Sequence, residues 1–323
     1  MQSLFRDMAV ETTPDARSFA GRVLINTWNS VKSTLFGEPA ALDDMERYSF
    51  DHKRRGVALI VCNDKFQGQA PRQGSEHDVK HFEKTFIKFG FSPQDIRIRY
   101  NMNAGDMLDW FLAVSMEDHS DADCLMVAIS SHGDEYRYTD PERSNVTKRE
   151  DVIHTTDKVI FTRDLVDIFR DKHCPSLKDK PKIFLLQACR GTKLDDGVEI
   201  QEEDMDVVDA MTEPEYTISP PPCFKDFCIV YATPPGFFAF RRPSEGSWFV
   251  KAFWDIVEKV DPSRVDFLRL VTLVIHQVAF SFQSSAVDPR IDGKKQSGCI
   301  YSMLTKDIYF TPKQEADELM SKP

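Results

Sequence analysis

The chain has 323 residues, with 41 lysine and arginine side chains against 52 aspartate and glutamate, which gives a net charge of −11. A hydrophobic content of 41% is enough for a packed core and excludes wholesale disorder. The acidic excess argues against nucleic acid or an anionic membrane as partner. No apolar stretch reaches the roughly 18–20 residues of a membrane span. Seven cysteines, an odd number, do not indicate a disulfide framework, so we expect a soluble, reduced, cytoplasmic protein.

Residues 1–45 differ from the rest of the chain and form a short leader. One candidate amphipathic helix in it carries apolar residues at near-helical spacing, namely Leu24, Trp28, Val31 and Leu35. Gly37 and Pro39 end this helix. Two interpretations stay open: a flexible leader with a transient helix, or a segment that docks on a partner or a membrane.

From Arg55 onward, apolar strands alternate with amphipathic helices. In chain order, the patterns predict a strand at 56–62, a helix with Val79, Phe82, Phe86 and Phe89 ended by Gly90, a strand at 95–100, a helix capped by Asn103, a strand at 123–130, a helix capped by Thr162, and a strand at 182–187. This alternation predicts an α/β fold in which a doubly wound sheet carries helices on both faces.

Residues 194–216 interrupt the alternation with ten acidic residues and no lysine, arginine or histidine. Like charges without counter-ions repel one another, so we expect an exposed, mobile linker. The apolar pattern then resumes with a strand at 227–233, helices at 247–260 and 268–280, and a last strand at 299–304. This C-terminal piece has too few strands to fold alone, so the linker interrupts one sheet.

Two strand ends carry residues capable of chemistry: His132 after one strand and Cys189 after another, each next to a small residue or glycine. In open α/β sheets the site lies beyond the carboxyl ends of the strands. A thiol becomes a good nucleophile when a nearby imidazole takes its proton. Each residue alone has an ordinary structural explanation, a buried small hydrophobe for the cysteine and a solvated loop for the histidine. The pair at equivalent strand ends favours catalysis.

The sequence Gln-Ala-Cys-Arg-Gly at 187–191, with Ser-His-Gly at 131–133, resembles the caspase family. The resemblance covers residues 48–310 and implies a three-layer α/β/α sandwich with a mainly parallel central sheet. It further implies that Cys189 is the nucleophile and His132 the acid–base. The amides of Gly133 and Cys189 would form the oxyanion hole. The family uses no third carboxylate, no cofactor and no metal, so we expect none here.

Substrate specificity also follows from the resemblance, because caspases cleave after aspartate and hold this P1 carboxylate with guanidinium groups. The positions that match the family's substrate-binding residues are Arg72, Gln187 and Arg241 around the carboxylate, Phe238, Phe240 and Trp248 along apolar subsites, and Arg242 beside the P4 pocket. Taken singly, the arginines could be solvated surface charges and the aromatic residues ordinary core. Arg242 either favours an acidic P4 residue or points to solvent.

Caspases are made as precursors that are cut after aspartate in such an acidic segment. Asp209, in an Asp-x-x-Asp sequence at 206–209, is the preferred processing site, with Asp196, Asp204 and Asp206 as weaker candidates; the alternative is a merely solubilising loop. Removal of the leader is expected near Asp43 or Asp44. The predicted organisation is a prodomain at 1–45, a large subunit at 46–209 and a small subunit of the same domain at 210–323.

The resemblance implies an apoptotic executioner-type endopeptidase that acts on proteins as a homodimer of large/small pairs. An upstream caspase and inhibitor proteins would be its further partners. A charged insertion at about 134–151, and Tyr136 where the family has a glycine, favour an alternative: a catalytically silent regulator that binds another caspase. A related arginine- or lysine-directed peptidase would need an acidic pocket, and Arg72 with Arg241 argues against it.

Overall fold

The computed structural model describes residues 47–67, 71–140, 143–195, 216–218 and 224–313. The expected leader helix, most of the acidic linker, and the processing residues Asp44 and Asp209 lie outside these ranges. No helix in the described part of the chain is long and apolar enough to cross a membrane.

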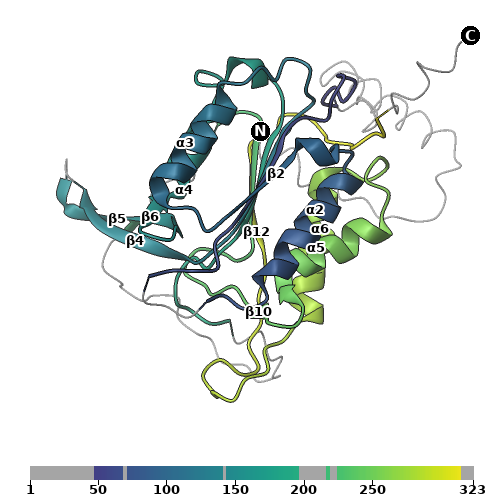
Figure 1. The fold of residues 1–323 in the computed structure, drawn as a ribbon. Helices are drawn as coiled ribbons and strands as arrows, with labels where there is room; N and C mark the ends of the chain where they lie inside the picture. The colour runs from purple at the N-terminus through teal and green to yellow at the C-terminus, as the bar shows by residue number, and fades with distance from the viewer. Residues whose placement is uncertain (1–46, 68–70, 141–142, 196–215, 219–223, 314–323) are drawn as a thin grey trace, which may run out of the picture. The chain divides into compact units, whose positions relative to one another are not determined.

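A six-stranded sheet forms the centre of the fold (Figure 1). Its strands, in spatial order, are β12 (Cys299–Ser302), β9 (Phe227–Tyr231), β7 (Lys182–Gln187), β3 (Leu125–Ser130), β1 (Ala58–Cys62) and β2 (Ile96–Tyr100). Neighbouring strands are parallel except for β12, which runs antiparallel to β9. This arrangement confirms the predicted mainly parallel α/β fold.

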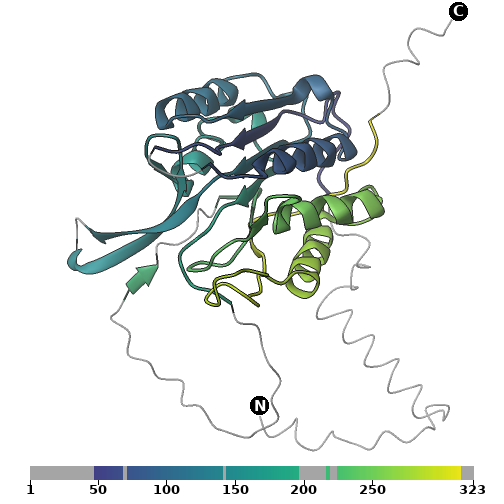
Figure 2. The ribbon, with the colours of Figure 1, turned by 60° about the horizontal axis from the view of Figure 1, so that its bottom comes forward.

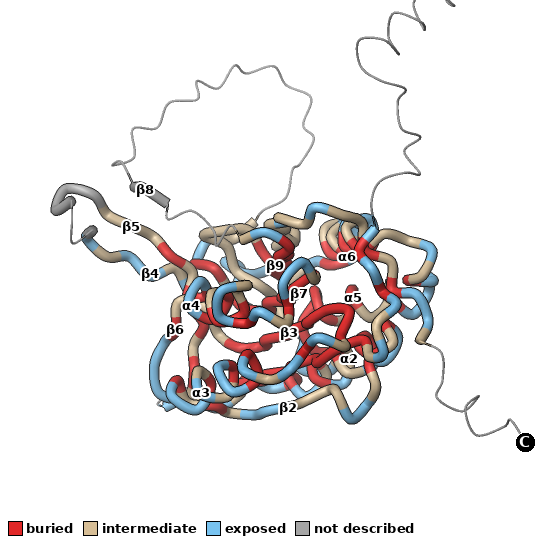
Figure 3. Tube along the Cα trace, turned by 90° about the horizontal axis from the view of Figure 1, so that it is seen from above, coloured by how far each residue is buried: buried red, intermediate tan, exposed pale blue. Residues whose placement is uncertain are grey.

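Helices cover both faces of the sheet, so the protein has three layers (Figure 1). Helices α2 (Ser75–Lys88), α5 (Trp248–Lys259) and α6 (Phe267–Ser281) lie on one face, and α3 (Ala104–Ser115) and α4 (Thr162–Asp167) lie on the other. Alternate residues of β1 enter the two cores: Ile60 packs on the first face and Leu59 on the second. Figure 3 shows this burial along the central strands. Cover on both faces explains why the inner strands β1, β3 and β9 are continuous apolar runs.

Two predicted helix caps have different outcomes. The side chain of Asn103 caps α3 by accepting a hydrogen bond from the amide of Asp106 at 2.8 Å, as expected. The predicted cap at Thr162 is wrong. The short strand β6 (Val159–Phe161) leads directly into α4, so Thr162 is already helical and Phe161 occupies the position before it. The Thr162 hydroxyl is buried and makes no hydrogen bond in the described part of the chain.

The charged insertion forms a long antiparallel hairpin of β4 (Gly133–Asp140) and β5 (Arg143–His154), which extends away from the central sheet (Figure 2). Sequence analysis identified this segment only as an insertion, because charged side chains line it and no apolar alternation marks its strands. Strand β8 (Tyr216–Ile218), directly after the acidic linker, pairs with β5. Two-residue strands β10 (Arg241–Arg242) and β11 (Gly246–Ser247) were likewise not predicted.

Candidate active site

Adjacent parallel strands bring the two reactive loops to the same edge of the sheet. Ser130 at the end of β3 pairs with Gln187 at the end of β7. The amide of Ser131 then donates to the Gln187 carbonyl at 3.1 Å. His132 and Cys189 each follow two residues after this pair, so the register itself places both residues at the carboxyl ends of neighbouring strands.

The residue after the histidine lies directly against the cysteine backbone. A Cβ atom added to Gly133 would lie 2.5 Å from the carbonyl oxygen of Cys189 and 2.8 Å from the Cβ of Ala188. Only glycine allows this approach without displacing the backbone. The two loops that carry the expected oxyanion amides, those of Gly133 and Cys189, are therefore in direct contact.

The Cys189 thiol is half-buried and in contact with the following segment of the fold. The amide of Ala239 donates to Sγ at 3.4 Å. Burial raises the pKa of the Cys189 thiol, while this hydrogen bond and the positive charge of Arg72 act in the opposite direction. The net shift is upward, so the free protein holds a neutral thiol near neutral pH.

His132 is also neutral at physiological pH. Burial, with the nearby charges of Arg72 and His154, lowers the pKa of the imidazole from 6.5 to about 4. The ring of Phe66 lies 4.7 Å from the His132 ring, centroid to centroid, and contributes apolar surroundings. A neutral imidazole can accept a thiol proton, which a protonated one cannot.

Arg72 is buried and held in place by polar groups from three segments. Its Nη1 donates to the Asn63 carbonyl at 2.9 Å, and both Nη atoms lie 3.2 Å from the Ser130 hydroxyl oxygen. Ser130 in turn donates to Asp78 at 2.7 Å. Burial lowers the pKa of Arg72, and the positive charge of Arg241 acts in the same direction.

Two polar side-chain atoms here are buried and make no hydrogen bond in the described structure. They are Nε of Arg72 itself and Oε1 of Gln187. Buried polar atoms normally have partners, so the unpartnered Nε is a donor available to an anion. Arg241 donates from its own Nε to the Gln73 carbonyl at 2.7 Å, which fixes its stem. The structure therefore brings Arg72, Gln187 and Arg241 to the same end of the sheet as Cys189.

Two of the three predicted aromatic residues, Phe240 and Trp248, form a stack. The rings of Phe240 and Trp248 lie 4.7 Å apart at 20°, and Phe282 continues the stack 5.5 Å beyond Trp248. Arg242 is exposed; it donates to Glu245 and to the Gln283 carbonyl, both at 3.3 Å.

Phe238 lies on the loop whose next residue, Ala239, contacts Cys189. Its amide donates to the Lys193 carbonyl at 2.9 Å, which ties it to the loop that follows Cys189.

The residues that hold this site in place were not predicted from the sequence. Asn63, Asp78 and Ser130 orient Arg72, and Asp151 pairs with Arg190 beside the cysteine. Their positions in the sequence carry no common signal, because each comes from a different strand, helix or loop. The charge of Asp151 was visible only as part of the insertion.

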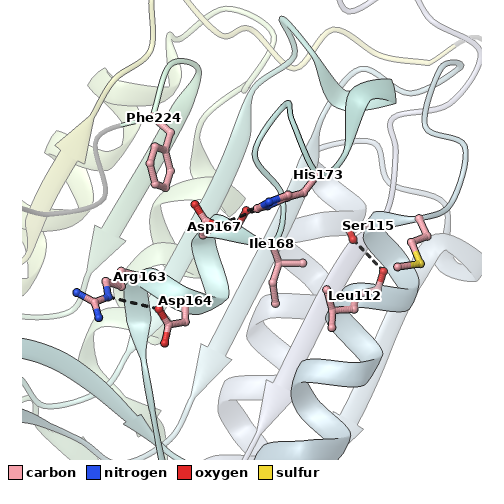
Figure 4. A pocket seen from close by; sticks show the side chains of 9 residues that line it. Leu112, Ser115, Arg163, Asp164, Asp167, Ile168, His173 and Phe224 are labelled. Carbon is pink, nitrogen blue, oxygen red and sulfur yellow. Dashed lines mark hydrogen bonds and ion pairs between the residues drawn. The ribbon is translucent and has the colours of Figure 1, made fainter.

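The cavity in Figure 4 lies elsewhere in the fold and has a volume of about 490 Å³. Its lining contains none of the predicted site residues and consists of Leu112, Ser115, Met116, Arg163, Asp164, Asp167, Ile168, His173 and Phe224. Its charged residues already pair with other side chains, as Arg163 does with Glu150 and Asp167 with Arg170. Among the described residues, no group of three or more His, Cys, Asp or Glu side chains is arranged to hold a metal ion.

Comparison with known proteins gives consistent matches. A family model for the caspase domain matches residues 55–309. Caspase-3 of Mesocricetus auratus is 34% identical over 266 residues, which are 81% of this chain and 86% of that protein. Caspase-7 of Gallus gallus is 30% identical over 313 residues, 94% of each chain. The crystal structure of caspase-1 from Spodoptera frugiperda superposes with a TM-score of 0.69 at 29% identity, covering 84% of this chain and 96% of that one.

Proposed function

The chain belongs to the caspase family of cysteine peptidases, and we propose that it is an active endopeptidase that cleaves proteins after aspartate. The observation that carries the proposal is the placement of the Cys189 and His132 loops beside a buried arginine whose Nε has no partner in the described structure. In this proposal Cys189 is the nucleophile, His132 is the neutral base, and Arg72 with Arg241 supplies the cationic groups that would bind the substrate carboxylate.

The first step follows from the two neutral groups. His132 takes the thiol proton of Cys189, and the resulting thiolate attacks the carbonyl carbon of the substrate. The carbonyl oxygen becomes an oxyanion, which the amides of Gly133 and Cys189 stabilise. His132 then gives the proton to the leaving amine as the peptide bond breaks. Water attacks the acyl-enzyme with His132 as base, which releases the acid product and restores the thiol.

Specificity for aspartate would rest on the two arginines, Arg72 and Arg241. A P1 carboxylate would accept hydrogen bonds from Nε of Arg72 and from the Arg241 guanidinium, and would offset the repulsion between these two cations. Gln187 adds a polar side chain to the same pocket. The stacked rings of Phe240 and Trp248, together with Phe238, suit apolar residues that precede the aspartate, and Arg242 would face the P4 residue.

Activation would follow from a cut in the acidic linker, most favourably after Asp209, with removal of the leader at Asp44. The products would be a large subunit at 46–209 and a small subunit at 210–323. Strand β12 lies at one edge of the central sheet, which supports pairing of two catalytic units through this strand. We expect an executioner-type role in apoptosis in the cytoplasm, with an upstream caspase as activator and inhibitor proteins as further partners.

The second candidate is a silent regulator that binds another caspase. It is favoured by the hairpin β4–β5, whose root lies at Gly133 beside the site. The two functions predict opposite results in a direct assay.

The test is hydrolysis of a fluorogenic acetyl-Asp-Glu-Val-Asp peptide by the purified chain before and after cleavage at Asp209. Turnover is expected for the cleaved wild type and should be lost in Cys189→Ala and in His132→Ala. A peptide with glutamate in place of the final aspartate is the specificity control. No turnover by the cleaved, folded wild type would overturn the proposal and favour the regulator.

A further inference from the structure

The hairpin β4–β5 has one edge that is only partly covered. Strand β4 occupies one edge of β5. The pairing runs from the pair Gly133–Ile153 at the root to the pair Thr139–Thr147 toward the tip. On the other edge, β6 pairs only with residues 152–154, near the root. Closer to the tip, residues 147–149 of that outer edge pair with β8, in parallel. An uncovered strand edge is a template for a further extended segment.

The segment on this edge has a special place in the chain. Strand β8 (Tyr216–Ile218) begins where the acidic stretch 194–216 ends. The root of the same hairpin contacts the catalytic loop, through Gly133 against Cys189 and through Asp151 paired with Arg190. One hairpin therefore contacts the catalytic loop at its root and the end of the linker near its tip.

Charge favours the same pairing. The partner segment of β8 on β5 includes Lys148 and Arg149, of which Arg149 already pairs with Glu135 at 3.3 Å, whereas residues 194–216 contain only acidic charges. Opposite charges within about 10 Å attract each other at moderate ionic strength. Charge therefore favours the docking, and the parallel pairing of β8 with residues 147–149 fixes its register.

We propose that the outer edge of β5 is a docking surface for the segment that follows the acidic linker of the same chain, and that this docking slows proteolysis of the linker. A protease must bind several linker residues in an extended form, so a segment held at residue 216 has to detach before nearby bonds are cut. The inference concerns the precursor and does not depend on the activity of Cys189.

Two proline variants test the docking in the full-length Cys189→Ala chain. Successive amides of a strand point to opposite sides, so only one of Thr217→Pro and Ile218→Pro removes a hydrogen bond to β5. Hydrogen exchange followed by mass spectrometry should show protection over 216–218 that is lost in one of the two variants. Thr212→Pro, outside β8, is the matched control and should retain the protection. Equal, rapid exchange in all chains would overturn the proposal.

A shortened hairpin tests the effect on proteolysis. Replacing residues 137–149 with Asn-Gly joins Tyr136 to Glu150, a pair already opposite each other, and keeps Asp151 and Gly133 in place. A glutamyl endopeptidase should then cut the glutamates of 199–215 faster by about threefold or more, because the competing docked state is gone. Equal rates in wild-type and shortened Cys189→Ala chains would overturn the proposal. So would protection that grows with protein concentration, since that indicates docking on a second copy.

Discussion

Asp151 of the hairpin holds the guanidinium of Arg190, the residue next to the proposed nucleophile, through two hydrogen bonds of 3.0 and 2.6 Å. The Arg190 carbon Cζ also lies 3.8 Å from the centre of the Tyr231 ring, and its Nη2 donates to Tyr301. Burial lowers the pKa of Arg190, but the hydrogen bonds and charge of Asp151 outweigh burial and raise it. The inserted hairpin is therefore joined to the loop that carries Cys189 by an ion pair in which the Arg190 side chain is buried and Asp151 is partly exposed.

Asp151→Asn should destabilise the protein and weaken catalysis, because it leaves the Arg190 charge buried without its counter-ion. Loss of one partner of such a pair costs about 3 kcal/mol of unfolding free energy. Urea unfolding measures this change, and Glu258→Gln on the exposed side of α5 is the control. Equal stability of the Asp151→Asn and control proteins would show that the ion pair contributes nothing.

Gly133→Ala should abolish most activity, because its Cβ would lie 2.5 Å from the Cys189 carbonyl oxygen and one of the two loops must move. A misplacement of about 1 Å at a reacting centre costs about 100-fold in rate. Gly105→Ala is the matched control: it lies in α3, and its Cβ would meet no atom closer than 3.5 Å. We expect the kcat/KM of Gly105→Ala to equal that of the wild type. Similar values for both variants would disprove the close contact.

Arg72→Lys should reduce kcat/KM for the Asp-Glu-Val-Asp peptide by about 100-fold or more, because lysine lacks the Nε donor and the planar fork that match a carboxylate. The hydrogen bonds to Asn63 and Ser130 would be lost or rearranged as well. Arg264→Lys, at an exposed arginine, serves as control. A kcat/KM near the wild-type value in Arg72→Lys would show that other residues bind the P1 carboxylate of the substrate.

The ionisation of His132 gives a pH prediction. Its pKa of about 4 in the folded protein lies below the ordinary value of 6.5. Between these values the unfolded chain binds a proton that the native site does not, so this histidine's stabilising contribution is complete above pH 6.5 and is lost as the pH falls toward 4. A histidine-labelled NMR titration of Cys189→Ala should give a midpoint well below 6.5, with His132→Gln identifying the signal. A midpoint at or above 6.5 would contradict the buried, neutral base.

Local patterns were sufficient for the central layers. The short apolar run at 56–62 predicted a strand covered on both faces, which the structure has at 58–62, and the period of Val79, Phe82 and Phe86 predicted the helix beside it. The hairpin was not predicted from 134–151, because a strand pair that extends into solvent needs no apolar face. The Thr162 cap failed because a strand runs directly into that helix, which only the tertiary structure specifies.

The sequence by itself determined the family, the order of the central strands and of the helices that cover them, and the strand ends at which His132 and Cys189 stand. These properties follow from short-range periodicity and from a five-residue motif. Only the tertiary structure decided which groups surround them: that Ser130 and Asn63 orient Arg72, that Asp151 neutralises Arg190, and that β8 lies on β5. These contacts join residues far apart in the chain, and their energies depend on burial and distance, which the sequence does not contain.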